Sequence, residues 1–250
     1  DTFTIRLEAL VSMRDLAVPA GKAGILVQAP NVTLDLNGFR IAGGAYGVQL
    51  GAGTGGWMVV KNGHIFGSSL AGVEGTAGAG CRYEGLTITV GNAEGLNGGP
   101  QSVIEKCSVK LAGSPGILAP EGSAVRQCTV ETTGGVGIWI PGAGVVAECT
   151  VKGGTSEGIR AGGSGATISH CSVTGANTGI FAGNGANVVE SCTAYQNTLG
   201  FWAGESIVRN CVAEFSAMQG FRIGNGCTLS ACRAIDNGTS GTYANIWVEG

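Results

Sequence analysis

The sequence contains little charge, few aromatic rings and almost no histidine. Of its 250 residues, 12% are Asp, Glu, Lys or Arg, 6% are Phe, Trp or Tyr, and two are histidine. The net charge of -3 argues against a nucleic-acid partner, because surfaces of that kind gather Lys and Arg. No apolar run reaches the roughly 18 residues of a membrane-spanning helix, so no membrane span is expected. No signal peptide is recognised, and a chain that starts at Asp1 is expected to have been processed or trimmed.

The residues that build metal sites and acid pairs are scarce and scattered. The only aspartates are Asp1, Asp15, Asp35 and Asp236. A hard cation needs several oxygen ligands together, and a zinc site needs closely spaced Cys or His, such as the CxxC motif that this sequence lacks. We therefore expect neither a metal nor a cofactor. Paired aspartates for glycoside hydrolysis are missing as well.

Proline is rare, with 6 residues, whereas glycine is abundant, with 47. Scarce proline suits a protein made of paired strands, because proline cannot donate to a sheet ladder. The glycines lack the every-third spacing of collagen. We expect them at turns, where the backbone needs positive φ.

Two markers recur with a period near 21 residues. Seven of the nine cysteines are separated by 21, 21, 22, 21, 19 and 21 residues: Cys107, Cys128, Cys149, Cys171, Cys192, Cys211 and Cys232. Gly-Ile or Gly-Phe pairs, from Gly116-Ile117 to Gly220-Phe221, keep the same period. Each repeat holds three short strand-like segments. This pattern predicts a solenoid in which each repeat forms one turn of a coil.

The cysteines are predicted to point inward. Most are followed by Ser or Thr and then by Val or Ala, and residues i and i+2 of a strand share a face. A buried free cysteine behaves as a small apolar side chain. Seven parallel thiols are poorly placed to pair as disulfides.

Both markers extend beyond the cysteine repeats. The Gly-Ile column continues upstream to Gly24-Ile25 and downstream to Asn245-Ile246, and the cysteine column is expected to continue as Leu86, Ile65 and Phe39. About eleven coils at the strand spacing give a rod about 50 Å long. The prediction is a single all-β domain, a right-handed parallel β-helix over residues 23–250, with an N-terminal cap over residues 1–22 formed by a short helix or a covering strand.

One segment and the repeats together resemble a known family. Residues 31–41, which read NVTLDLNGFRI, are followed by the Gly-Ile and C-[ST]-V coils. This arrangement resembles secreted bacterial right-handed parallel β-helix repeat proteins, relatives of the pectate lyase fold, over nearly the whole chain. The resemblance implies the fold and an extracellular or cell-surface location. It leaves the activity open, because that fold hosts lyases, hydrolases, epimerases, tailspikes and inactive scaffolds.

The residue after each Gly-Ile pair is predicted to point outward. The column reads Leu26, Gln49, Glu74, Asn97, Leu118, Trp139, Arg160, Phe181, Trp202, Arg222 and Trp247. Rings alternating with guanidinium groups suit an extended, acidic polysaccharide, so the predicted substrate-binding residues are Trp139, Arg160, Phe181, Trp202 and Arg222. Two other interpretations stay open: self-association, since Trp and Arg are enriched at interfaces, and plain stacking along a sheet.

Catalysis is not evident, and whether the protein is an enzyme stays open. The weak catalytic candidates are Glu157, beside Arg160, and three residues of the cysteine-flanking columns: Lys152, His170 and Tyr195. Lys110, Glu131 and Lys152 alternate in sign along neighbouring strands, which is typical of a salt-bridge ladder.

The sequence thus predicts an extracellular polysaccharide-binding β-helix. The alternatives are a self-associating module of a fibre, tailspike or surface stalk, as a homo-oligomer or with further C-terminal coils, and a calcium-independent polysaccharide lyase or epimerase.

Overall fold

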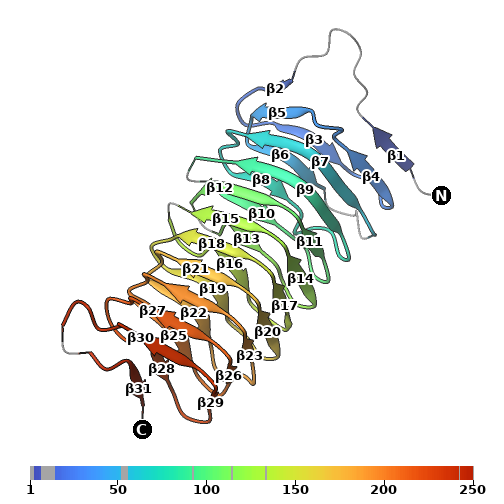
Figure 1. Cartoon of the computed structure of the whole chain (residues 1–250). Coiled ribbons are helices and arrows are strands. Elements are labelled where there is room, and N and C mark those ends of the chain that lie inside the picture. Colours follow the sequence, from blue (N-terminus) through green and yellow to red (C-terminus); the bar gives the residue numbers. More distant parts are fainter. Residues whose placement is uncertain are drawn as a thin grey trace.

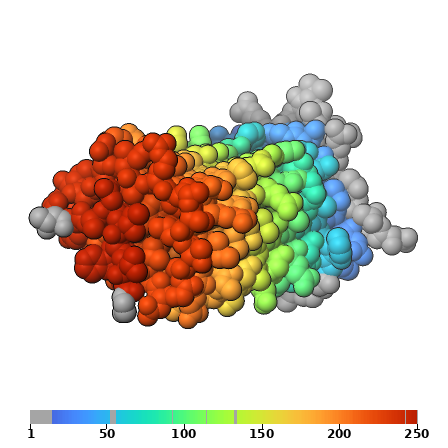
Figure 2. Space-filling model, turned by 60° about the horizontal axis from the view of Figure 1, so that its bottom comes forward, coloured from blue at the N-terminus to red at the C-terminus, as the bar shows by residue number. Residues whose placement is uncertain are grey.

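The chain forms a rod of stacked coils in which every strand pairing is parallel (Figure 1). The computed structural model describes residues 3–6, 15–51, 56–91, 93–113, 115–132, 134–241 and 243–249. These residues contain strands, turns and bends and no helix. The space-filling view shows the coils following one another in sequence order along the rod (Figure 2). The predicted all-β, right-handed parallel β-helix of about eleven coils is therefore confirmed.

The smaller of the two sheets holds one strand from each coil, in sequence order. Its eleven strands are β3 (Ala23–Val27), β6 (Tyr46–Leu50), β8 (Ala71–Glu74), β10 (Glu94–Asn97), β13 (Ile117–Leu118), β16 (Ile138–Ile140), β19 (Glu157–Ala161), β22 (Thr178–Ala182), β25 (Leu199–Ala203), β28 (Phe221–Ile223) and β31 (Ile246–Val248).

The larger sheet has twenty strands that form two ladders side by side. The strands at the position before the cysteine column are β1 (Phe3–Arg6), β4 (Val32–Asp35), β7 (Val59–Phe66), β9 (Arg82–Thr89), β11 (Val103–Glu105), β14 (Ser123–Arg126), β17 (Gly144–Ala147), β20 (Ala166–Ser169), β23 (Val188–Glu190), β26 (Ile207–Arg209) and β29 (Thr228–Ser230). The strands at the position after the cysteine column are β2 (Leu16–Val18), β5 (Arg40–Gly43), β12 (Ser108–Ala112), β15 (Thr129–Thr132), β18 (Thr150–Gly153), β21 (Ser172–Thr174), β24 (Thr193–Tyr195), β27 (Val212–Glu214) and β30 (Arg233–Ile235). Strands β7 and β9 are long enough to run through both ladders.

The column of cysteines lies inside the coil, as predicted. All nine cysteines are free thiols. The seven regularly spaced ones, which we call the ladder cysteines, are buried except Cys232, which is half-buried near the C-terminal end. The thiols donate to backbone oxygens: Cys128 Sγ lies 3.2 Å from Arg126 O and 3.7 Å from Ile104 O. The column therefore fills the core with small side chains whose weak donors are satisfied.

The glycine of each Gly-Ile pair is required by close packing rather than by its φ angle. At Gly158 an added Cβ would lie 2.2 Å from Val173 Cγ1 and 2.9 Å from Gly179 O. Any side chain there would collide with the strand opposite and with the next coil. The expectation that glycine serves turns holds at other positions, such as Gly165, where φ is +78°.

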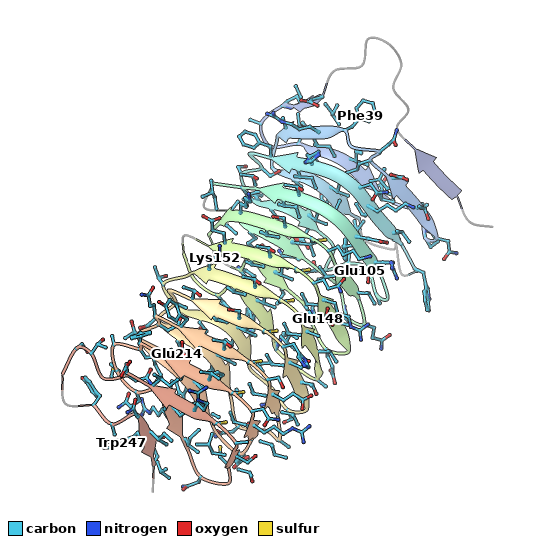
Figure 3. The ribbon with its side chains drawn as sticks, in the orientation of Figure 1. Phe39, Glu105, Glu148, Lys152, Glu214 and Trp247 are labelled. Atoms are coloured by element: carbon cyan, nitrogen blue, oxygen red, sulfur yellow. The ribbon has the colours of Figure 1, made fainter. Side chains whose placement is uncertain are left out.

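The cysteine column continues upstream in a different register from the one expected. Leu86 pairs with Gly63, while Ile65 pairs with Ile88 in the neighbouring inward column. Arg40 pairs with His64, so Phe39, one residue earlier, lies beside Gly63 in the same column (Figure 3). An added Cβ at Gly63 would lie 2.4 Å from Leu36 Cβ, so the leucine side chain already occupies this place in the core.

The first residues extend the larger sheet by one layer. Strand β1 pairs in parallel with β4, and β2 pairs in parallel with β5. Residues 7–14 of the predicted cap lie outside the described residues. The predicted division between residues 1–22 and 23–250 stays a prediction. At the opposite end, the last strand, β31, is exposed along its whole length.

Candidate functional site

The predicted outward column lies along the smaller sheet in unbroken register. Each residue pairs with its counterpart in the next coil, from Leu26 with Gln49 through Trp139 with Arg160 to Arg222 with Trp247. Figure 3 shows Trp247 at the C-terminal end of the rod. We call Trp139, Arg160, Phe181, Trp202 and Arg222 the aromatic–arginine row.

The side chains of the aromatic–arginine row contact one another in sequence. The Arg160 guanidinium carbon lies 5.8 Å from the Trp139 ring centre and 5.5 Å from that of Phe181. The Phe181 and Trp202 rings meet edge to face at 5.1 Å and 84°. Arg222 lies 4.7 Å from the Trp202 ring. These distances are those of cation–π and aromatic contacts, so the row is one continuous packed surface.

A cavity opens beside the middle of the row. Its volume is about 360 Å³, and it is lined by Arg160, Gly162, Phe181, Ala182, Gly183, Asn184, Trp202 and Gly204. Glycines follow β19, β22 and β25 directly, and Asn184 brings the side chain of a turn residue to the cavity.

The two arginines of the row differ in how their charge is compensated. Arg222 Nε donates to Glu249 Oε1 at 2.5 Å, and its terminal nitrogen pairs with the same carboxylate. Arg160 Nη1 lies 3.7 Å from Glu157 Oε1, which is longer than a hydrogen bond. Glu157 Oε2 accepts a hydrogen bond from Ser156 Oγ at 2.5 Å. Arg222 is therefore held by its acid, whereas Arg160 is only weakly paired.

The weak catalytic candidates do not form one site. Glu157 lies on β19 of the smaller sheet, next to Arg160. Lys152 and Tyr195 lie in one column of the larger sheet, two coils apart with Thr174 between them. His170 occupies the bend between β20 and β21. The structure thus brings Glu157 to the row and leaves the other three candidates on another face.

The expected alternation of charge is present without the ion pairs of a salt-bridge ladder. Lys110 pairs in register with Glu131, and Glu131 with Lys152. Within the described part of the chain, these three residues form no ion pair with one another. Figure 3 shows Lys152 along one edge of the coil and Glu148 along the other, so these two charged side chains lie on different parts of the surface.

A column of left-handed corner residues was missed by the sequence analysis. The residue before each ladder cysteine has a φ between 51° and 56°: Lys106, Gln127, Glu148, His170, Ser191, Asn210 and Ala231. This conformation bends the chain between the two ladders of the larger sheet. It is costly for residues other than Gly and Asn, so His170 has a backbone role whatever its side chain does. The varied chemistry of the column hid that shared role.

A pair of acidic side chains was missed as well. Asn97 Nδ2 donates to Glu74 Oε2 at 3.2 Å and to Glu94 Oε2 at 2.5 Å. Glu74 and Asn97 belong to the outward column, and Glu94 lies three residues before Asn97. The sequence contains no paired aspartates, and its spacing gives no signal that glutamates of adjacent coils approach the same asparagine.

Neither a metal cluster nor a membrane helix is found in the described part of the chain. No three His, Cys, Asp or Glu side chains in it gather as metal ligands would. The described residues also contain no helix with the length and apolar character needed to cross a bilayer.

Solved structures with a similar fold include an alginate lyase and a tailspike protein. An alginate lyase from Paenibacillus sp. str. FPU-7 matches with a TM-score of 0.55 at 11% identity, over 95% of this chain and 99% of the lyase. The Dettilon tailspike protein matches with a TM-score of 0.52 at 13% identity, over 94% of this chain. The chain spans 60% of the length of that tailspike chain. At these identities the likeness shows the fold alone.

Comparison with protein families covers nearly the whole chain. A search of curated protein sequences gives no significant match. The family model described as the right-handed beta helix region matches residues 23–159 and, overlapping them, residues 115–248. This agrees with the predicted fold family and with the parallel coils observed. The chain is therefore a member of the right-handed β-helix family.

Proposed function

We propose that this protein is an extracellular β-helix that binds an extended polysaccharide along its aromatic–arginine row. The observation that carries the proposal is the continuous surface of rings and guanidinium groups beside a cavity of about 360 Å³. Successive coils lie about 4.8 Å apart, close to the length of one sugar ring in an extended glycan. Apolar sugar faces stack on aromatic rings, and Arg pairs with carboxylates or sulfates.

The similar solved structures agree with this proposal without deciding it. One is named as an alginate lyase, so a rod of this shape handles a polysaccharide in that protein. The row in this chain lies where an extended ligand would contact several coils at once.

The test is a glycan array followed by titration of two ring variants. Trp202→Ala and Phe181→Ala each remove one ring that lines the cavity, and each is expected to weaken binding more than tenfold. Trp57→Ala is the matched control, because Trp57 is 79% exposed and lies outside the row. Unchanged affinity in both row variants, or an equal loss with Trp57→Ala, contradicts the proposal.

A second candidate function, self-association, is favoured by the exposed last strand. Ile246, Trp247 and Val248 of β31 are 42%, 51% and 70% exposed. A strand at a sheet edge offers unpaired backbone groups to another chain. Val248→Lys would place a charge on this strand and is expected to dissociate an oligomer in sedimentation velocity. A wild-type monomer at high concentration removes this candidate.

A further inference from the structure

Two nitrogen donors of the aromatic–arginine row are buried without an acceptor. Trp139 Nε1 and Arg160 Nε are both inaccessible and form no hydrogen bond with any described residue. Leaving a buried donor unpaired costs about 1–3 kcal/mol, so native proteins rarely keep two of them side by side. A ligand that supplies the acceptor would explain both.

The two donors lie around a space that a glycine keeps open. A Cβ built on Gly162 would lie 3.4 Å from Trp139 Nε1 and 3.9 Å from Arg160 Nε. Gly162 also lines the cavity beside Arg160 and Phe181. Arg160 and Gly162 thus line the cavity, and the Trp139 donor lies behind them, beside Gly162.

Arg160 is the row's arginine that is available to an anion. Its ion pair with Glu157 is 3.7 Å long, and it forms no side-chain hydrogen bond with the described residues. A shift of its guanidinium group therefore breaks no hydrogen bond with a described residue. Arg222 is already engaged by Glu249 through Nε and a terminal nitrogen.

We propose that the cavity at Gly162 receives the anionic group of an acidic glycan, a carboxylate or a sulfate. The inference rests on the proposed glycan-binding function and adds the charge of the ligand and the residues that select it. Arg160 moves to pair with the anion, and the indole N–H of Trp139 donates to one of its oxygens. Gly162 determines specificity because it leaves room for that group.

The experiment compares charged and neutral forms of the same sugar chain. Oligogalacturonate and its full methyl ester form one pair of probes, and sulfated and unsulfated cello-oligosaccharides form the other. Dissociation constants are measured by calorimetry at fixed ionic strength for the wild type, Arg160→Gln, Gly162→Ala and two controls. Circular dichroism and the urea midpoint confirm that each variant is folded.

The expected result is a selective loss for the charged probe. Arg160→Gln should weaken binding of the preferred charged probe by about ten- to a hundredfold and change the neutral probe by less than about threefold. Gly162→Ala should act in the same direction, because the methyl group fits with ordinary contacts but fills the space. The pair that discriminates identifies carboxylate or sulfate.

The controls separate this inference from the proposed function. Gly224→Ala changes the glycine at the same place three coils on, where the added Cβ meets nothing closer than 3.5 Å, and should leave both affinities unchanged. Arg222→Gln should weaken charged and neutral probes by equal factors. Equal binding of both probes, with loss of both in Trp202→Ala, overturns the inference and keeps glycan binding. Wild-type protein that binds neither probe pair overturns both.

Discussion

Ile159→Ala tests whether the interior columns hold the rod together. Ile159 is fully buried in β19, with Ile138 and Ile180 beside it in the neighbouring coils. The substitution removes three carbon atoms, which costs about 2–3 kcal/mol in lost transfer free energy at ~0.8 kcal/mol each. The paired backbones above and below prevent the column from closing over the gap, so we expect a loss of about 2–5 kcal/mol. Urea denaturation measures it, with an unchanged m-value.

The control for this experiment lies in the same column. Ile246 of β31, in the last coil, pairs with Phe221 of the coil before it and is 42% exposed. Ile246→Ala makes the same chemical change where solvent already reaches the side chain, so it should cost less than about 1 kcal/mol. Equal losses at the two positions would refute the view that the columns form one continuous core.

Three further perturbations test other features of the coil. Ala231→Gly relieves a left-handed φ of 51° and should raise the free energy of unfolding by about 1 kcal/mol, visible as a higher urea midpoint; a lower midpoint would contradict this. Tyr83→Phe removes a buried hydroxyl that faces the Cys81 thiol, a weak hydrogen-bonding group, so the free energy of unfolding should change by less than about 1 kcal/mol, and a larger loss would reveal a stronger hydrogen bond. Burial raises the pKa of the Cys81 thiol above its usual 9.0. Because the unfolded thiol ionises first, this contribution to stability is complete below pH 9 and should decline as the pH rises further, in urea titrations.

The inward column of the smaller sheet could be predicted from the sequence over its whole length. Every pairing from Ile25 to Ile246 has the expected register. Parallel strands one coil apart place equivalent residues over one another, and a shift by one would turn the apolar side chains outward. The close approach at Gly158 fixes the register further, because only glycine fits beside Val173.

The cysteine column could not be predicted as far, because the coils vary in length where turns connect them. The step from Gly63 to Leu86 is 23 residues, so counting back by 21 places Ile65 in the wrong column. A turn can take up two extra residues at little cost, since its backbone faces solvent. Periodicity locates strands within a coil, and it says little about the loops between them.

The partners of the outward side chains were the least predictable part of the site. Arg222 and Glu249 are 27 residues apart, and the acid reaches the arginine across the long last coil. Glu74 and Glu94 meet at Asn97 in the same way, from adjacent coils. A long polar side chain can reach several neighbours, so its partner depends on its rotamer. The sequence does not specify that rotamer.

The unpaired donors distinguish a binding surface from a row that only stacks. A row that served stability alone would gain from removing Trp139 Nε1, since the nitrogen is buried without an acceptor. Trp139→Phe removes that donor and keeps an aromatic ring under Arg160. We expect the free energy of unfolding to change by less than about 1 kcal/mol, because the lost ring area offsets the relieved donor. Affinity for the charged oligosaccharide should fall at least about tenfold, measured by calorimetry beside a urea melt. Unchanged affinity, whatever the change in stability, would show that the Trp139 donor takes no part in binding.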